Sequence, residues 1–234
     1  MFTTDNGTEN FSWPDGGQTP FAGGKGTAME GGFRSSCILS WPGHVPADSI
    51  QNAIFSGLDW FPTFVAAAGD PNIAAELVKG KALGGTTYKV HLDGYNQMDL
   101  ITGKGPSARN EVFYFTESTL SAVRVKDFKY RFTDQPSGWL GSTVKVDWPI
   151  LVNLRLDPFE RTGMYDGKNN GSLYYPTWWG FEFWRFVLVQ NEIAKYAQTF
   201  VEFPPMQAGA SFNLSALKAE LDKKMEAAKG GPGN

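Results

Sequence analysis

Two short stretches of the sequence carry residue types that can do chemistry. The first is Asp5-Asn6, within the opening string Phe-Thr-Thr-Asp-Asn-Gly. An aspartate and an asparagine at the carboxyl end of a strand offer two hard oxygen ligands to Ca²⁺ or Mg²⁺, and the carboxyl edge of an α/β sheet is where such sites lie. The alternative is an ordinary strand-to-turn corner, because Asp-Asn-Gly is common turn chemistry, and the dipeptide alone favours the turn.

The second stretch runs from Gly23 to Arg34, with the sequence GGKGTAMEGGFR, and surrounds Lys25 with glycines. Glycines let the backbone fold tightly and present the single ammonium group to an anion. The glycine and lysine spacing of a P-loop is absent, which excludes that kind of phosphate site. A solvated lysine in a flexible turn is the alternative for GGKG alone, but the whole twelve-residue string is more specific.

Composition limits the other classes of function. The chain has 234 residues, of which 41% are hydrophobic, and a formal net charge of -3. That is enough apolar material for a sizeable core, and no basic block suggests nucleic acid as a partner. One Cys and two His argue against a disulfide scaffold and against a Cys-rich or His-rich metal centre. No stretch of 18 uncharged apolar residues occurs, so the sequence predicts no membrane span.

The pattern of elements predicts an α/β layer followed by a smaller antiparallel sheet with helices. Residues 7–32 are predicted to form one long ordered loop, 33–41 a strand, and 56–68 a helix with Asp59 as its N-cap. Alternating and helical spacings of apolar residues predict four further strands and two helices. The strands are expected at 111–115, 121–126, 128–132 and 150–156, and the helices at 182–201 and 213–229.

Several other residues have plain structural interpretations. Cys37 lies in an apolar string and is expected to be a small core residue, whereas His44 and His91 are expected on the surface. Residues 173–186 contain eight aromatic side chains in fourteen positions. That density could stack on sugars, on an aryl substrate or on a partner chain, but core packing is favoured because so much aromatic area must be buried.

The strings FTTDNG, PFAGGKGTAMEGGFR, LSWPGHVP and SGLDWFPTFVAAAG together resemble the sulfatase family, the alkaline-phosphatase-like sulfuric ester hydrolases. The strings LDGYNQMDLITGK, ARNEVFYF, VRVKDFKYRF and LVNLRLDPFE are similar to the C-terminal subdomain of the family, and FVEFPPMQAGASFNL to the tail of bacterial arylsulfatases. The resemblance covers essentially the whole chain in the same order. It implies an α/β fold, the C-terminal end of the alkaline-phosphatase-like catalytic sandwich, over 1–103. An α+β subdomain with a small antiparallel sheet and helices is implied over 104–234.

The resemblance also implies roles for three residues. Asp5 and Asn6 match two ligands of the family's active-site divalent cation, normally Ca²⁺. Lys25 matches the lysine that contacts the sulfate group, where a fixed ammonium would offset charge building on the sulfonyl oxygens in the transition state. The string Glu-Gly-Gly-Phe-Arg at 30–34 matches a structural turn and implies no catalytic role.

One motif of the family is missing. Family members carry a Cys- or Ser-x-Pro-Ser-Arg string whose first residue is oxidised to formylglycine, the hydrated aldehyde that attacks sulfur, and this sequence has no such string. Further ligands of the cation and of the sulfate also lie upstream in the family. We therefore expect a C-terminal portion that is inactive alone, with formylglycine in a missing N-terminal part. Its expected partners are a small-molecule or carbohydrate sulfate ester and that N-terminal part, or further copies in a homo-oligomer.

Two alternative functions remain open at this point. A phosphodiesterase or phosphonate hydrolase of the same superfamily is the nearer one, although the GGKGTxxEGGxR string favours a sulfatase. The other is a non-catalytic carbohydrate-binding or interaction module that uses residues 173–186, against which the intact Asp5, Asn6 and Lys25 argue. Family members are commonly exported, which implies a periplasmic or secreted parent, while the location of this chain itself is left unspecified.

Overall fold

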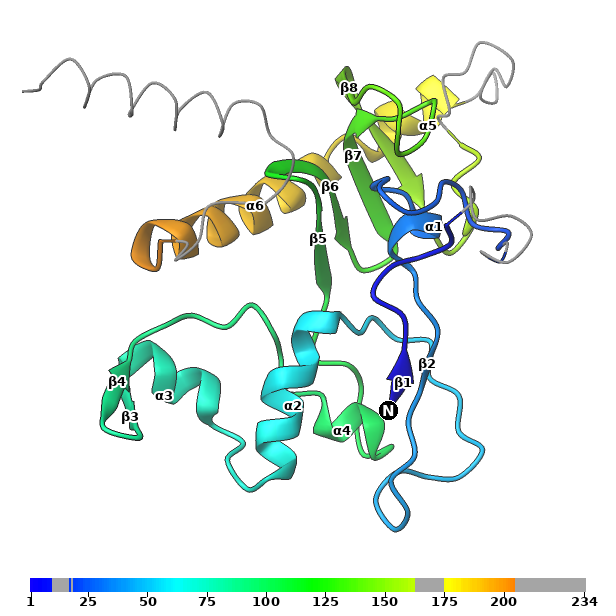
Figure 1. Ribbon diagram of the computed structural model, residues 1–234. Coiled ribbons are helices and arrows are strands. Elements are labelled where there is room, and N and C mark those ends of the chain that lie inside the picture. The colour runs from blue at the N-terminus through cyan, green and yellow to red at the C-terminus, as the bar shows by residue number, and fades with distance from the viewer. Residues whose placement is uncertain (10–16, 18, 163–174, 205–234) are drawn as a thin grey trace, which may run out of the picture. The chain divides into compact units, whose positions relative to one another are not determined.

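The computed structural model describes residues 1–9, 17, 19–162 and 175–204 (Figure 1). The chain divides into two compact units, Met1–Phe203 and Pro204–Asn234, and the first of them is described below. The predicted helix at 213–229 lies outside the described residues, and the predicted domain boundary after residue 103 stays a prediction. None of the described helices is both long enough and apolar enough to span a bilayer.

The centre of the first unit is an antiparallel four-stranded sheet with the order β5-β6-β7-β8. Its strands are β5 (Glu111–Thr116), β6 (Thr119–Val125), β7 (Phe128–Asp134) and β8 (Val144–Asn153). The predicted meander is thus confirmed, because residues of alternating polarity pair across short turns. β8 begins well before the predicted 150–156 strand. The register of β8 against β7 shifts along the strand. The first half of β8 was not predicted because Pro149 cannot donate a ladder hydrogen bond and so argues against a strand in the sequence.

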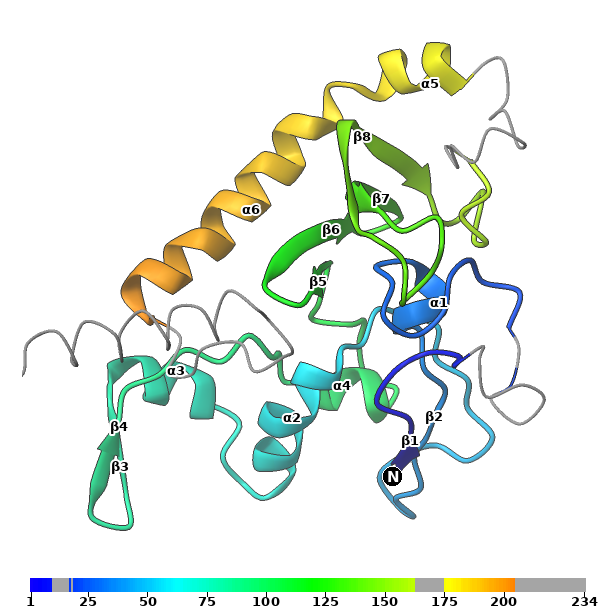
Figure 2. The same ribbon diagram turned by 45° about the horizontal axis from the view of Figure 1, so that its top comes forward.

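The two faces of this sheet are covered by different parts of the chain (Figure 2). On one face, Val123, Tyr130 and Leu151 pack with Val189 of the long helix α6 (Arg185–Glu202). The preceding helix α5 (Tyr175–Glu182) adds tryptophans to the same cluster. The predicted helix at 182–201 is therefore confirmed, and its apolar stripe covers the sheet.

On the opposite face, Ala122 and Tyr114 form a small cluster with Ala28. Ala28 belongs to the Gly-rich segment 22–33, which ends in the short helix α1 (Glu30–Phe33). Because side chains alternate along a strand, Lys129 and Arg131 of β7 share this face with Ala122, their near neighbour on β6. The Gly-rich segment therefore covers a charged part of the sheet.

The N-terminal strand β1 (Phe2–Thr3) pairs antiparallel with β2 (Cys37–Ile38), with Phe2 opposite Ile38. The strand predicted at 33–41 is thus reduced to two residues, since α1 still includes Phe33. Cys37 is exposed, so the prediction of a core residue was wrong. The cause is that a two-stranded ribbon has no second layer packed over Cys37 among the described residues.

Between β2 and the sheet lie the η2 turn (Gly57–Asp59), the helices α2 (Trp60–Ala67), α3 (Ile73–Lys79) and α4 (Met98–Ile101), and the hairpin β3 (Lys81–Leu83)–β4 (Thr86–Tyr88). The helix predicted at 56–68 is present as the η2 turn followed by α2, and Asp59 stands at the N-cap position of α2 as predicted, although its side chain makes no cap hydrogen bond to that helix. Ser56 caps the preceding η2 turn: its hydroxyl accepts from Leu58 N, and its own amide donates to Asp59 Oδ2 over 2.9 Å, which makes a capping box.

Candidate functional site

Main-chain hydrogen bonds tie the Gly-rich segment to the residues that follow β1. Gly7 N donates to Gly32 O over 2.9 Å, Thr8 N to Gly31 O over 3.1 Å, and Lys25 N to Thr8 O over 2.7 Å. Asp5 and Asn6 stand immediately before this paired stretch. The structure therefore brings the three residues singled out by the sequence into one region, where two separate segments meet.

Glycines make this approach possible. A Cβ on Gly7 would lie 1.9 Å from Gly31 O, and a Cβ on Gly31 would lie 2.4 Å from Gly23 O and 2.5 Å from Ala22 O. Gly31 N also donates to Ala22 O over 2.7 Å. These positions exclude any side chain, so the repeated glycines serve the close contact of backbones more than flexibility.

Two groups of this region hold the Lys25 side chain. Its Nζ lies 3.1 Å from Glu9 Oε2, and 4.8 Å from the centroid of the Trp139 ring. Both members of the ion pair are 31% exposed, so the ammonium is positioned and still reachable by an anion. Glu9 could not be recognised from the sequence, because nothing in the spacing of residues links it to a lysine sixteen positions later.

Asp5 and Asn6 present oxygen atoms. Asp5 is exposed and Asn6 is partly buried, with Asn6 Nδ2 donating to Gly7 O over 2.8 Å. In the part of the chain that the structure describes, the Asp5 carboxylate and the Asn6 amide oxygen accept no protein hydrogen bond. These oxygens suit a hard cation by type. They are too few to complete its shell, and the described residues contain no group of three or more His, Cys, Asp or Glu that could hold a metal.

A buried carboxylate anchors the Gly-rich segment to the sheet. Glu30 Oε1 accepts from Tyr114 OH over 2.8 Å and from Lys129 Nζ over 3.1 Å. Glu160 completes the anchor: its Oε2 accepts from Glu30 N over 2.5 Å, and its Oε1 lies 3.1 Å from Lys129 Nζ. The side chains of Lys129 and Glu160 are fully buried. The segment that carries Lys25 is thus held by an ionic cluster beneath it.

The environment keeps this anchor in its charged form. Burial alone would raise the pKa of Glu30, but the Lys129 ammonium, the Tyr114 hydroxyl and the Arg124 guanidinium outweigh it, so the pKa lies below its ordinary value of 4.5. For Tyr114, burial and then the neighbouring Glu30 charge hold the pKa well above 10. At neutral pH, Glu30 is therefore an acceptor and Tyr114 a donor.

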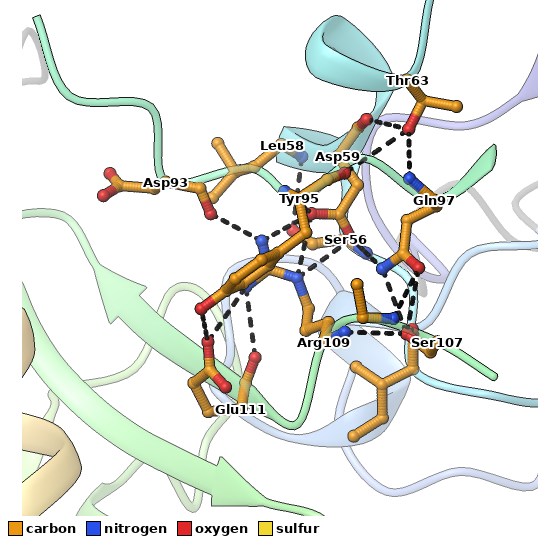
Figure 3. A network of polar contacts seen from close by, with 12 residues as sticks. Ser56, Leu58, Asp59, Thr63, Asp93, Tyr95, Gln97, Ser107, Arg109 and Glu111 are labelled. Atoms are coloured by element: carbon orange, nitrogen blue, oxygen red, sulfur yellow. Dashed lines mark hydrogen bonds and ion pairs between the residues drawn. The ribbon is translucent and has the colours of Figure 1, made fainter. Parts of the chain in front are cut away.

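A second buried network centres on Asp59 and Arg109 (Figure 3). Arg109 Nη2 lies 2.6 Å from Asp59 Oδ1 and Arg109 Nε 3.0 Å from Asp59 Oδ2. Asp59 also accepts from the main-chain nitrogens of Ser56 and Tyr95, and from Gln97 Nε2. Both oxygens of the Asp59 carboxylate accept hydrogen bonds. The network therefore joins the start of α2 to the loop before β5. Its role is structural, and no local pattern in the sequence indicates a pair of residues fifty positions apart.

The two histidines and the aromatic segment singled out in the sequence are surface or core residues in the structure. His44 and His91 are exposed, as predicted. His44 stacks on Trp41 with ring centroids 4.0 Å apart, and His91 Nδ1 lies 3.2 Å from Asp93 Oδ1. The aromatic segment is divided. Trp178 and Trp179 of α5 and Phe186 of α6 pack against the buried cluster on the sheet, whereas Phe181, Phe183 and Trp184 are exposed.

Comparison with known proteins agrees with this picture. No family model matches the sequence. Human arylsulfatase A (Homo sapiens) is 30% identical over 184 residues, which cover 71% of this chain and 33% of that protein. The N-acetylgalactosamine-6-sulfatase of Sus scrofa is 31% identical over 185 residues, covering 69% of this chain and 32% of that protein. The chain thus spans about a third of the length of these curated relatives.

A similar solved structure is the PsFucS1 sulfatase from Pseudoalteromonas sp., with a TM-score of 0.69 and 24% identity, covering 89% of this chain and 38% of that one. This likeness confirms the fold class, a mixed α/β architecture of the sulfatase type with a small antiparallel sheet. Together with the sequence matches, it shows that the chain belongs to the sulfatase family, as its motifs predicted.

Proposed function

We propose that the chain is part of a sulfuric ester hydrolase, which converts a sulfate ester and water into an alcohol and sulfate. Asp5 and Asn6 are ligands of a divalent cation, Ca²⁺ in the simplest case, and Lys25 binds the sulfate group. One observation carries the proposal: the hydrogen bond of 2.7 Å from Lys25 N to Thr8 O brings the lysine segment onto the segment that follows the two oxygen ligands.

Lys25 has the chemistry that a sulfate ester requires. Its ammonium would donate to a sulfonyl oxygen and would offset the charge that grows there in the transition state. Glu9, 3.1 Å away, competes with the anion for the same donor and keeps the side chain oriented in its absence. A divalent cation on Asp5 and Asn6 would act as a Lewis acid toward the same group.

The nucleophile in this proposal lies outside the present sequence, which contains no Cys- or Ser-x-Pro-Ser-Arg string. By itself the chain is expected to bind the anion without turning over a sulfate ester. The substrate is a small-molecule or carbohydrate sulfate ester, and the parent protein is expected to be periplasmic or secreted. Association with the part that supplies the nucleophile would complete the site.

Calorimetric titration with CaCl₂ tests the cation ligands. Two protein oxygens predict a weak site, with a Kd of about 10⁻⁴–10⁻³ M for the unaltered chain and no measurable binding for Asp5→Asn. Asp127→Asn, an exposed carboxylate at a β-turn, is the matched control and should bind as the unaltered chain does. Unchanged binding by Asp5→Asn would overturn the assignment, and submicromolar binding would contradict the two-ligand site.

Thermal unfolding in sodium sulfate, compared with sodium chloride of equal ionic strength, tests the lysine. Sulfate should raise the melting temperature of the unaltered chain, because a ligand that binds only the folded state stabilises it. Lys25→Met should remove that increase, while Lys104→Met, an exposed lysine, should keep it. An equal response of the two variants would show that Lys25 does not bind sulfate.

A further inference from the structure

A tryptophan from a distant part of the chain lies beside Lys25. The ammonium of Lys25 stands over the Trp139 ring, 4.8 Å from its centroid. Trp139 belongs to the connection between β7 and β8, which reaches the Gly-rich segment near α1 (Figure 2). Because the face of an indole attracts a cation, the ring helps to orient the lysine of the proposed sulfate site.

The position of the Trp139 ring requires a glycine at residue 26. A Cβ on Gly26 would lie 2.1 Å from Trp139 Cδ1 and 2.2 Å from Trp139 Cγ. The φ of Gly26 is +82°, a backbone conformation that also favours glycine. The ring therefore packs directly on the backbone next to Lys25, which fixes it close to the ammonium.

The loop that carries Trp139 presents two large apolar side chains to solvent. Gly138 N donates to Gln135 O over 2.9 Å, and Gly141 N donates to Gly138 O over 2.9 Å, so a turn lies on each side of Trp139 and Leu140. Trp139 is 41% exposed and Leu140 is 87% exposed. Single exposed apolar residues are common, but this pair lies on a loop at the ammonium of the proposed sulfate site. Apolar surface next to a few polar groups is typical of ligand-binding sites.

The distances allow a substrate to contact both residues at once. A sulfate oxygen that accepts from Lys25 Nζ lies about 2.8 Å from it, and so within about 8 Å of the Trp139 ring centroid. The alcohol part of the ester is joined to the sulfate through a single oxygen and begins at this distance. Aromatic rings stack with their centroids about 4.5–7 Å apart. A ring on the ester oxygen can therefore lie against Trp139 while the sulfate stays on Lys25.

We propose that Trp139 binds the alcohol part of the substrate, by stacking the exposed part of its indole on a ring of that alcohol. Trp139 is then a specificity residue that favours sulfate esters of ring-bearing alcohols, sugars or aryl groups, over esters of small open-chain alcohols. The place of the substrate rests on the proposed function, because Lys25 has to hold the sulfate. The preference for a ring rests on Trp139.

A tryptophan that only orients Lys25 would give a different result from one that stacks on the substrate. Loss of the orienting contact would weaken the binding of every sulfate ester alike. Loss of a stacking surface would weaken only the esters that carry a ring. Three probes separate the two roles: methyl sulfate, which has no ring, 4-nitrophenyl sulfate, which has an aryl ring, and glucose 3-sulfate, which has a sugar ring.

Calorimetry of the chain as it exists measures the dissociation constants of the three esters. The unaltered chain should bind 4-nitrophenyl sulfate or glucose 3-sulfate more tightly than methyl sulfate, and the tighter of the two identifies the kind of ring. Trp139→Leu fills part of the same space without an aromatic face. It should reduce the preference for the ring ester about three- to tenfold, the effect of losing one stacked ring. Trp139→Phe keeps an aromatic face and should retain part of the preference.

Trp184→Leu is the matched control. Trp184 is 56% exposed, and the Arg185 guanidinium lies 4.4 Å from its ring centroid, so it is also an exposed tryptophan with a cation over the ring. It precedes α6 and does not belong to the proposed site. Its replacement should leave the affinities for all three esters unchanged, and thermal unfolding shows whether each variant is folded.

The outcomes separate this inference from the proposed function. Equal affinity of the unaltered chain for ring esters and methyl sulfate would overturn the stacking role, as would a preference that persists in Trp139→Leu. An equal loss of affinity for all three esters in Trp139→Leu would show a residue that only orients Lys25. Binding of none of the esters by the unaltered chain would also overturn the stacking role. Failure of the proposed function is recognised in Lys25→Met, which would then bind methyl sulfate as tightly as the unaltered chain.

Discussion

The ammonium of Lys129 lies 3.1 Å from the carboxylate of Glu30, although ninety-nine residues separate the two in the chain. Lys129 comes from the middle of the antiparallel sheet, and Glu30 comes from the segment that presents Lys25. The position of the proposed sulfate-binding lysine therefore depends on a residue buried in a different part of the fold. Glu160, also 3.1 Å from the ammonium, shares the same cation.

Replacing Lys129 with methionine should destabilise the fold by about 3–5 kcal/mol, because it leaves the two buried carboxylates without their shared cation. Urea unfolding at pH 7 measures the change in the free energy of unfolding. Lys145→Met, an exposed lysine on β8, should change stability by less than about 0.5 kcal/mol. Equal stability of the two variants would contradict the anchoring role of Lys129.

The depressed pKa of Glu30 predicts how stability depends on pH. Burial opposes ionisation, but Lys129, Tyr114 and Arg124 together lower the pKa in the folded state below 4.5. The unfolded chain then binds a proton more readily than the folded one, so this stabilisation is fully present above the unfolded pKa. It is lost as the pH falls from about 4.5 through the lower folded value.

Urea unfolding from pH 7 to pH 3 measures this contribution. The unaltered chain should lose stability below pH 4.5 more steeply than Glu30→Gln, which has no proton to gain at this position. The variant should be less stable at pH 7, and the gap should narrow toward pH 3. A constant gap across the whole range would mean that Glu30 does not titrate with folding.

Alanine substitutions at two glycines with different surroundings test whether the Gly-rich segment needs its glycines for close backbone contact or for flexibility. Gly31→Ala places a Cβ 2.4 Å from Gly23 O, so the Gly-rich segment must move. We expect a loss of about 2 kcal/mol or more, together with loss of the stabilisation by sulfate. Gly57→Ala is the control, since a Cβ there has nothing within 4 Å and the variant should keep both properties. A neutral Gly31→Ala would contradict the backbone contacts described above.

Local patterns in the sequence predicted much of this fold, because alternation and helical spacing depend only on which face of an element is buried. The strands β5, β6 and β7 and the helix α6 follow such patterns. The exposure of Cys37 could not be predicted this way, since an apolar string does not reveal whether a second layer of structure covers it.

The same distinction applies to the site: residues with a local sequence pattern could be recognised, whereas residues defined by contacts with distant parts of the chain could not. Asp5, Asn6 and Lys25 stood out because glycines surround or follow them, and their roles stay predictions. Glu9 carries no local signal, because its role is defined by an ion pair with a lysine sixteen residues later in the chain. Asp59 stands at the predicted N-cap position of α2, but its carboxylate binds Arg109, and a partner fifty residues distant leaves no local signal in the sequence.

The aromatic segment offers a test of core packing against a binding platform on one helix. Trp179 donates from Nε1 to Pro149 O over 3.1 Å and packs on the rings of Trp148 and Phe186, whereas Phe181 of the same helix is 78% exposed. Trp179→Ala should cost about 2 kcal/mol or more in urea unfolding, because it removes buried ring area and leaves a cavity.

Phe181→Ala should change the free energy of unfolding by less than about 0.5 kcal/mol, as expected for a side chain that contacts mostly solvent. Calorimetry of both variants with sodium sulfate should give the affinity of the unaltered chain, since neither ring belongs to the proposed anion site. Equal destabilisation by the two substitutions would show that α5 packs differently from the arrangement described. A loss of sulfate affinity confined to Phe181→Ala would instead move the anion site onto this helix and away from Lys25.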